Sequence, residues 1–355
     1  MNTFYRFWKL KQFEVGRSSQ LPQCGRSSRR AFLLSFFAGL GVTLTVAACS
    51  PTTSTQAEAG SPASPIAANR VVRIGHQKFD PFTLVKARGG LEKRLEPLGV
   101  RVEWTEFQSG PPMLEALNVG SIDIGRTGDA PPIIAQAADA PLVYIGGSKP
   151  KDQSSAVLIK ADSPIQTVAD LKGKKVGYAK GSSAHYLIVR VLETAGLTLN
   201  DIESAYLAPA DARSAFEQGG IDAWVIWDPF YAAAQEQMDV RVLRDSAGLV
   251  TNRDFYLAVD SYATENADVI EAIKQETQDV AAWADTNPDE VISILSPILG
   301  IEAPILDIVT KRRHYDFQPI SSEMIAEQQQ IADTFYEFDL IPKAITVSEI
   351  VWRSN

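Results

Sequence analysis

The chain has 355 residues, which is enough for a large core and for two domains, because single hydrophobic cores stop growing near about 250–300 residues. Hydrophobic residues make up 45% and charged residues 22%, as in ordinary soluble globular proteins. The formal net charge is −9, and it is −15 for residues 49–355, because residues 1–48 hold seven basic residues and one acidic residue. So acidic a chain argues against binding to nucleic acid and against a basic membrane-binding face, and any anionic ligand must be held by local donors.

The first 48 residues are expected to be an export signal. An apolar run at 31–48 follows the pair Arg29-Arg30 and leads into the sequence VAAC at 46–49. This arrangement resembles a twin-arginine signal that ends in a bacterial lipobox, where Cys49 would be lipidated and become the first residue. Plain cleavage and an uncleaved transmembrane anchor are the two alternatives.

The residues around Cys49 agree with export. Cys24 would leave with the signal and Cys49 would take lipid, so no cysteine would remain for a disulfide or a metal site. Residues 49–69 are rich in Pro, Ser, Thr and Ala and are expected to form a flexible tether. We therefore expect the folded part to be periplasmic, at the outer face of the cytoplasmic membrane, with a lipid anchor as its only membrane contact.

From residue 70 onward, short apolar strands alternate with helices, which predicts an α/β fold with mostly parallel sheets covered by helices. Strands are expected at 71–75, 100–107, 122–125, 141–145, 156–160, 175–179, 205–207, 221–226, 240–243 and 255–259. Helices are expected at 82–95, 111–118, from 129 onward, at 167–173, at 211–218 and 229–237, and over most of the chain after 261. A further helix is expected to follow the turn at 181–183 and to continue to about 195.

The pattern restarts near residue 163, which predicts two lobes. Residues 70–162 and 251–355 are expected to form lobe one, and residues 163–250 to form lobe two. Each lobe would have a mixed sheet flanked by helices. Because ligands of open α/β sheets bind beyond the carboxyl ends of strands, a ligand cleft is expected between the lobes.

Two strand–turn–helix stretches are candidate anion sites. In 176–186 a buried strand leads through Gly181, Ser182 and Ser183 into a helix, whose first N–H groups lack intrahelical acceptors and carry a partial positive charge. His185 lies one turn into that helix. The stretch 125–132 repeats the pattern with Thr127 and Gly128. Together the two helix starts predict an anion held by both lobes, whereas separately each is equally consistent with an ordinary capped helix.

Other side chains near strand ends are weaker candidates. Gln77 follows the first strand and can donate to a ligand oxygen. Trp227 can form an apolar wall beside an organic ligand or pack in the core, while Asp228 and Asp129 are expected mainly to cap helices. Lys311-Arg312-Arg313 is expected to be a solvated face. The three histidines lack metal-ligand spacing, and no nucleophile elbow, Walker loop or dinucleotide fingerprint appears.

Five longer stretches together resemble a known family. Residues 110–123, 127–132, 180–186, 222–229 and 328–342 are similar to the aliphatic sulfonate-binding proteins of ABC importers, within the sulfonate, nitrate and taurine type of periplasmic substrate-binding protein. The resemblance implies a type II periplasmic-binding-protein fold that closes as a hinged trap. It also implies a sulfonate ligand, an ABC permease as partner, no catalysis, no metal and no cofactor.

The resemblance also assigns ligand-binding roles. These fall on Gln77, Thr127, Gly128, Ser182, Ser183, His185, Trp227 and, less clearly, Asp228. The chain departs from the family at Arg126, where a small or apolar residue is expected, and at 79–82, and both departures affect which organic group fits.

Other functions remain open at this point. The same scaffold can bind a sulfate ester, taurine, nitrate, bicarbonate or a thiamine-precursor pyrimidine. An enzyme that makes a pyrimidine precursor would need a Cys-rich motif with iron, which the sequence lacks. A sensor input domain would need a second membrane segment and a signalling domain, and neither is expected.

Overall fold

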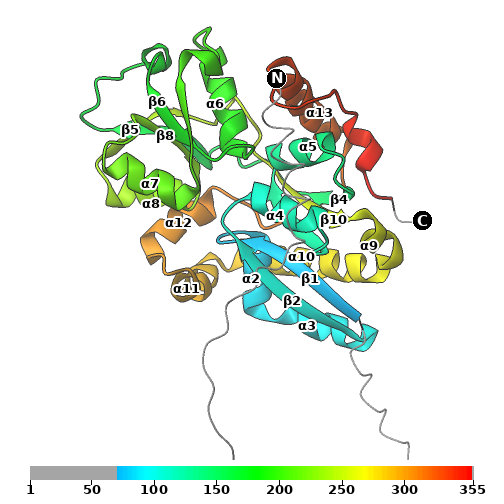
Figure 1. Cartoon of the computed structure of the whole chain (residues 1–355). Helices are drawn as coiled ribbons and strands as arrows, with labels where there is room; N and C mark the ends of the chain where they lie inside the picture. The colour runs from blue at the N-terminus through cyan, green and yellow to red at the C-terminus, as the bar shows by residue number, and fades with distance from the viewer. Residues whose placement is uncertain (1–69, 354–355) are drawn as a thin grey trace, which may run out of the picture. The chain divides into compact units, whose positions relative to one another are not determined.

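The computed structural model describes residues 70–353, so the expected export signal at 1–48, the lipidation site Cys49 and the tether at 49–69 lie outside the described residues. The described part contains two five-stranded sheets, ordered β2-β1-β3-β10-β4 and β7-β6-β8-β5-β9 (Figure 1). The first sheet comprises β1 (Arg70–Gln77), β2 (Val100–Phe107), β3 (Ile124–Gly128), β4 (Leu142–Gly147) and β10 (Asp254–Val259). The second comprises β5 (Ser155–Lys160), β6 (Lys175–Tyr178), β7 (Glu203–Tyr206), β8 (Ala223–Trp227) and β9 (Val240–Asp245).

Both sheets follow one plan. In the first, β1 pairs in parallel with β2 and β3, and β10 runs antiparallel between β3 and β4. In the second, β6 pairs in parallel with β7 and β8, and β5 runs antiparallel between β8 and β9. The expected α/β fold with two mixed sheets is confirmed, and the carboxyl ends of β1, β3 and β8 lie where such folds bind ligands.

The strand expected at 156–160 does not belong to lobe one. It is β5, in which Leu158 pairs with Trp224 of β8 and with Val242 of β9. Each sheet thus receives its antiparallel fourth strand directly after the chain has crossed between the sheets. The first crossing therefore falls at 148–154, and the expected boundary at 162/163 is wrong. The second crossing, at 246–253, leads into β10 of the first sheet.

Helices cover both sheets (Figure 1). They are α2 (Pro81–Arg88), α3 (Gly90–Leu95), α4 (Gly110–Asn118), α5 (Ala130–Ala137), α6 (Ser183–Glu193), α7 (Pro209–Glu217), α8 (Phe230–Gln237), α9 (Asp260–Glu265), α10 (Ala267–Thr286), α11 (Pro288–Leu299), α12 (Ala303–Lys311) and α13 (Ser322–Glu337). Short 3-10 turns lie at η1 (Glu96–Leu98), η2 (Val168–Leu171), η3 (Leu199–Asp201) and η4 (Val347–Ile350). No helix between residues 70 and 353 has both the length and the apolar character that crossing a bilayer requires.

Of the C-terminal helices, α10 packs on lobe one, whereas α12 contacts α8 of lobe two. Ile273 and Val280 of α10 share a core cluster with Val72 and Ile74 of β1. The helix expected at 82–95 is broken at Gly89, whose φ of 64° is in the left-handed region that glycine adopts without strain. The break turns α3 onto α10.

The two crossing segments are tied to each other. Asn252 Nδ2 donates to Ser154 Oγ at 2.8 Å and to Ser155 Oγ at 2.7 Å. Ser148 N donates to Asp254 O, and Asp254 N donates to Ser148 Oγ, both at 2.9 Å. Because these side chains are buried, the hydrogen bonds fix the position of the hinge between the lobes.

Candidate ligand-binding site

A pocket of ≈ 50 Å³ lies between the two sheets, beside the hinge. Since one water molecule needs about 10–15 Å³, the pocket between the lobes has space for a few waters. Seven of the eight predicted ligand-binding residues line this pocket. They are Gln77, Thr127, Gly128, Ser182, Ser183, Trp227 and Asp228.

The end of β3 brings an unused hydroxyl group to the pocket. Thr127 is fully buried, and its Oγ1 has no hydrogen-bond partner within residues 70–353. At Gly128 an added Cβ would collide with Ser183 Oγ of lobe two, so a larger residue here would force the Ser183 hydroxyl out of its present position. A ligand oxygen at this point can accept the Thr127 proton and remove the cost of an unpaired buried hydroxyl.

The start of α6 supplies donors from lobe two. Gly181 has a φ of 75°, which turns the chain from β6 into the helix. Ser182 is the N-cap, but its Oγ donates to Ala179 O at 2.7 Å and makes no capping bond. First-turn N–H groups of α6 are thus left for an anion, and the partial positive charge of the helix start favours one.

His185 is the predicted site residue that does not line the pocket. Its Nδ1 accepts a hydrogen bond from Gly181 N at 3.2 Å, and its ring stacks on Tyr178 with centroids 5.2 Å apart. Burial, helped by the nearby charge of Lys180, lowers the pKa of His185 to about 4. The neutral ring supports the turn from behind, a role that the position of His185 in the sequence did not reveal.

The start of α5 is a poorer donor than expected. Asp129 caps it, as predicted, by accepting the Ala130 N–H at 2.8 Å. Pro131 and Pro132 follow and have no N–H to offer. The expectation that both helix starts aim N–H groups at one anion therefore holds better for α6 than for α5. Lobe one contributes through Thr127 instead.

Three other predicted residues line the pocket in different ways. Gln77 donates one amide hydrogen to Arg126 O at 3.2 Å, which leaves its second one for a ligand. Trp227 is half-buried and packs against core residues of lobe two. Asp228 Oδ1 accepts from Ala232 N at 3.0 Å, whereas its Oδ2 has no hydrogen-bond partner among the described residues. Burial raises the pKa of Asp228 to about 6.

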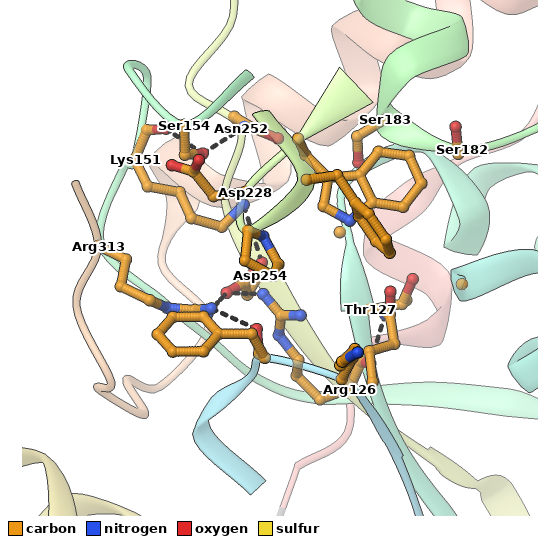
Figure 2. A pocket seen from close by; sticks show the side chains of 18 of the residues that line it. Arg126, Thr127, Lys151, Ser154, Ser182, Ser183, Asp228, Asn252, Asp254 and Arg313 are labelled. Atoms are coloured by element: carbon orange, nitrogen blue, oxygen red, sulfur yellow. Dashed lines mark hydrogen bonds and ion pairs between the residues drawn. The ribbon is translucent and has the colours of Figure 1, made fainter. Parts of the chain in front are cut away.

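The sequence interpretation missed a group of buried charges on the hinge side of the pocket (Figure 2). Asp254 Oδ1 lies 3.1 Å from Lys151 Nζ, and Asp254 Oδ2 lies 2.9 Å from Arg313 Nη2. Arg126 Nη2 also contacts Asp254 Oδ2. We call Arg126, Lys151, Arg313 and Asp254 the cation cluster. The expected solvated face at 311–313 is wrong for Arg313, whose side chain is only 5% exposed.

Burial and mutual repulsion weaken the positive charges of the cluster. Desolvation and the neighbouring Arg313 lower the pKa of Arg126 to about 9. Desolvation, with Arg126 and Arg313, also lowers the pKa of Lys151 well below its usual value. An anion in the pocket would reverse both effects. No group of His, Cys, Asp and Glu side chains in the described part is arranged to hold a metal ion.

The chain is similar to known proteins. The family model described as NMT1/THI5 like matches residues 97–291. A putative aliphatic sulfonates-binding protein from Escherichia coli is 45% identical over 284 residues, which are 79% of this chain and 88% of that protein. The chain is a member of the aliphatic sulfonate-binding protein family.

Solved structures of this family share the fold. The periplasmic aliphatic sulphonate binding protein SsuA from Escherichia coli is 45% identical, with a TM-score of 0.73 over 81% of this chain and 93% of that one. The alkanesulfonate-binding protein SsuA from Xanthomonas axonopodis pv. citri, bound to MOPS, is 39% identical. Its TM-score is 0.77 over 80% of this chain and 98% of that one. The desulfurization enzyme DSZB, at 12% identity and a TM-score of 0.60 over 80% of this chain and 96% of that one, shares the fold alone.

Proposed function

We propose that this protein captures an aliphatic or aryl sulfonate outside the cytoplasm and delivers it to an ABC permease without catalysing a reaction. The observation that carries the proposal is the excess of positive charge in the closed pocket. Four basic side chains and two acidic ones line it: Lys78, Arg126, Lys151, Arg313, Asp228 and Asp254. In a chain that is acidic as a whole, such local charge favours an anionic ligand.

The two lobes hold the sulfonate together. Its oxygens accept hydrogen bonds from Thr127 Oγ1 of lobe one and from the first turn of α6 in lobe two. Because neither lobe supplies both sets of donors, ligand binding favours the closed arrangement of the hinge. Trp227 lies beside the organic group and covers it from water. The permease then recognises the closed form.

The remaining features of the proposal concern location. Cys49 carries the lipid, the segment 49–69 tethers the folded part, and the lobes work in the periplasm. The name of the solved Escherichia coli relative, a periplasmic aliphatic sulphonate binding protein, supports the periplasmic location. Replacement of Cys49 by Ser should release the protein from membranes, which fractionation of cells would show.

The alternatives differ in charge. A neutral pyrimidine would leave the positive charges of the pocket uncompensated, so the structure favours an anion over it. Sulfate esters, nitrate and bicarbonate are anions and stay open. Taurine pairs a sulfonate with an ammonium group, for which the unpartnered Asp228 Oδ2 is the one suitable acceptor among the described pocket residues.

Calorimetry of the purified protein tests the proposal. The ligands are alkanesulfonates of two to eight carbons, an arylsulfonate, taurine, a sulfate ester, nitrate and bicarbonate. We expect sulfonates to bind and the inorganic anions to bind at least about tenfold more weakly, since only sulfonates also fill the space beside Trp227. Absence of binding by every sulfonate would contradict the proposed function.

A further inference from the structure

The cation cluster carries more charge than one sulfonate neutralises. Arg126, Lys151 and Arg313 supply three positive charges, and Asp254 supplies one negative charge. The neighbouring Lys78 and Asp228 cancel each other formally, so the lining of the pocket keeps two positive charges. One sulfonate group removes one of them. The second positive charge remains among the side chains that line the pocket.

The two arginines of the cation cluster also have too few hydrogen-bond acceptors. The side chains of Arg126 and Arg313 are 6% and 5% exposed, and the Nε atom of each has no hydrogen-bond partner within residues 70–353. A buried charge without a full set of hydrogen-bond partners destabilises the empty pocket. A ligand group with negative charge and several acceptor oxygens would offset this cost.

Nearby carboxylates partly offset the charge of the cluster, Asp80 at Arg126 and Asp129 at Lys151, but their hydrogen bonds serve other groups. Asp80 accepts hydrogen bonds from Gln77 N and Thr83 N and so caps α2. Asp129 caps α5 and does not line the pocket. Asp228 Oδ1 accepts from Ala232 N and lies 3.4 Å from Arg312 Nη1. The positive charge at the hinge therefore faces the pocket.

The cluster and the sulfonate donors lie on different sides of the pocket. Figure 2 shows Lys151, Asp254 and Arg313 on one side, with Ser182 and Ser183 on the other. The guanidinium group of Arg126 lies beside Asp254, as part of the cluster (Figure 2). Because both sets of residues line the same pocket, a ligand with two anionic ends can contact the start of α6 and the cluster together.

We propose, on the basis of the function proposed above, that the preferred ligand is a short-chain sulfonate with a second anionic group, such as a sulfocarboxylate. The sulfonate is held by Thr127 and the start of α6. The second group is held by Arg126 and Lys151, with Arg313 behind them. The ligand thereby neutralises both excess charges. Taurine, whose second group is an ammonium, is rejected by the same cations.

Pairs of ligands of equal carbon length test this inference by calorimetry on the purified protein. Sulfoacetate is compared with ethanesulfonate and with taurine, and 3-sulfopropanoate with propanesulfonate. Succinate shows whether a dianion without a sulfonate suffices. We expect each sulfocarboxylate to bind at least about tenfold more tightly than its alkanesulfonate, and taurine and succinate to bind more weakly than the sulfocarboxylates.

Two variants and a matched control locate the preference. Arg126→Gln and Lys151→Gln each remove one cation of the cluster, and each should reduce the ratio of sulfoacetate to ethanesulfonate affinity towards one. Arg253→Gln is the control, because Arg253 is an equally buried cation beside Asp254 that turns away to α13, with Nε 2.7 Å from Glu327 Oε2. Arg253→Gln should show the same ratio of sulfoacetate to ethanesulfonate affinity as the unmodified protein. Thermal melting confirms that each variant is folded, and Lys151→Gln carries the test if Arg126→Gln is not.

The outcomes separate this inference from the proposed function. The dianion preference would be overturned by equal affinities within each pair or by tighter binding of taurine. It would also be overturned if the cluster variants lost affinity for sulfoacetate and ethanesulfonate equally. Each of these results would leave sulfonate binding intact. Failure of every sulfonate to bind would overturn both.

Discussion

Thr127 is the residue whose role in binding is easiest to separate from its role in folding. Its buried Oγ1 has no hydrogen-bond partner in the described part of the chain, so Thr127→Val removes no bond from the protein. We expect sulfonate affinity to fall about tenfold or more, as for a lost hydrogen bond to a charged group, with a melting temperature that is unchanged or higher because an unpaired buried hydroxyl is removed. Calorimetry and thermal melting measure the two quantities.

A matched threonine provides the control for that variant. Thr277 is also fully buried, but its Oγ1 donates to Ile273 O at 2.8 Å within α10. Thr277→Val should leave sulfonate affinity unchanged. Equal affinity for the unmodified protein and Thr127→Val would show that the hydroxyl group does not contact the ligand.

Two pocket side chains predict how binding depends on pH. The pKa of Asp228 is raised to about 6 by burial, and its carboxylate opposes an anion once deprotonated. The pKa of Arg126 is lowered to about 9 by burial and Arg313, and its positive charge is lost above that value. Sulfonate affinity should therefore fall as pH rises through about 6 and fall again through about 9.

Affinity measured between pH 5 and 10 checks this profile. Asp228→Asn keeps an acceptor for Ala232 N, so it should remove only the fall near pH 6. Arg126→Gln should remove the fall near pH 9. Affinity that rises with pH would contradict the assigned charges.

Residue-level roles were only partly predictable from the sequence. Seven predicted residues reach the pocket because strand ends and helix starts are visible in the sequence pattern. His185 lies on a predicted helix, but the pattern did not show which way its ring faces. Lys151 and Arg313 lie in connecting segments, where no periodicity predicts burial. Arg126 was noticed only as a departure from the resembled family.

At the scale of elements, the contact between the end of β3 and the start of α6 governs closure. An added Cβ at Gly128 would collide with Ser183 Oγ, whereas Ser183 Cβ is 3.4 Å away. Gly128→Ala should thus weaken sulfonate binding about tenfold. In the Ser183→Ala background the same change should cost less, because the colliding oxygen is absent. Calorimetry on the unmodified protein, the two single variants and the double variant completes the double-mutant cycle. An equal loss of sulfonate affinity in both backgrounds would contradict direct contact between Gly128 and Ser183.

The positions of helices and strands were more predictable than the sheet that each strand joins. Apolar periodicity located the strands and most helices to within a few residues, since each needs only local sequence. It could not place β5, because a short apolar strand pairs equally well with either sheet. The pairing is decided by the hinge, where β5 and β10 each follow a crossing segment.

At the scale of the whole molecule, Asn252 links the two crossing segments. It has a φ of 51° and donates hydrogen bonds to Ser154 and Ser155. Asn252→Gly keeps the left-handed backbone but loses both bonds, so it should destabilise the protein by about 1–3 kcal/mol. Asn252→Ala should cost about 1 kcal/mol more, because alanine is strained at this φ. Denaturant unfolding compares them, and equal stability of the two variants would exclude backbone strain.

A crystal structure of the protein with a bound sulfonate tests the central claim most directly. We predict a closed form in which sulfonate oxygens lie within hydrogen-bond distance of Thr127 Oγ1 and of first-turn N–H groups of α6. The carbon chain should point past Trp227 towards Arg126. A sulfonate bound outside the pocket, or one that contacts a single lobe only, would contradict the account.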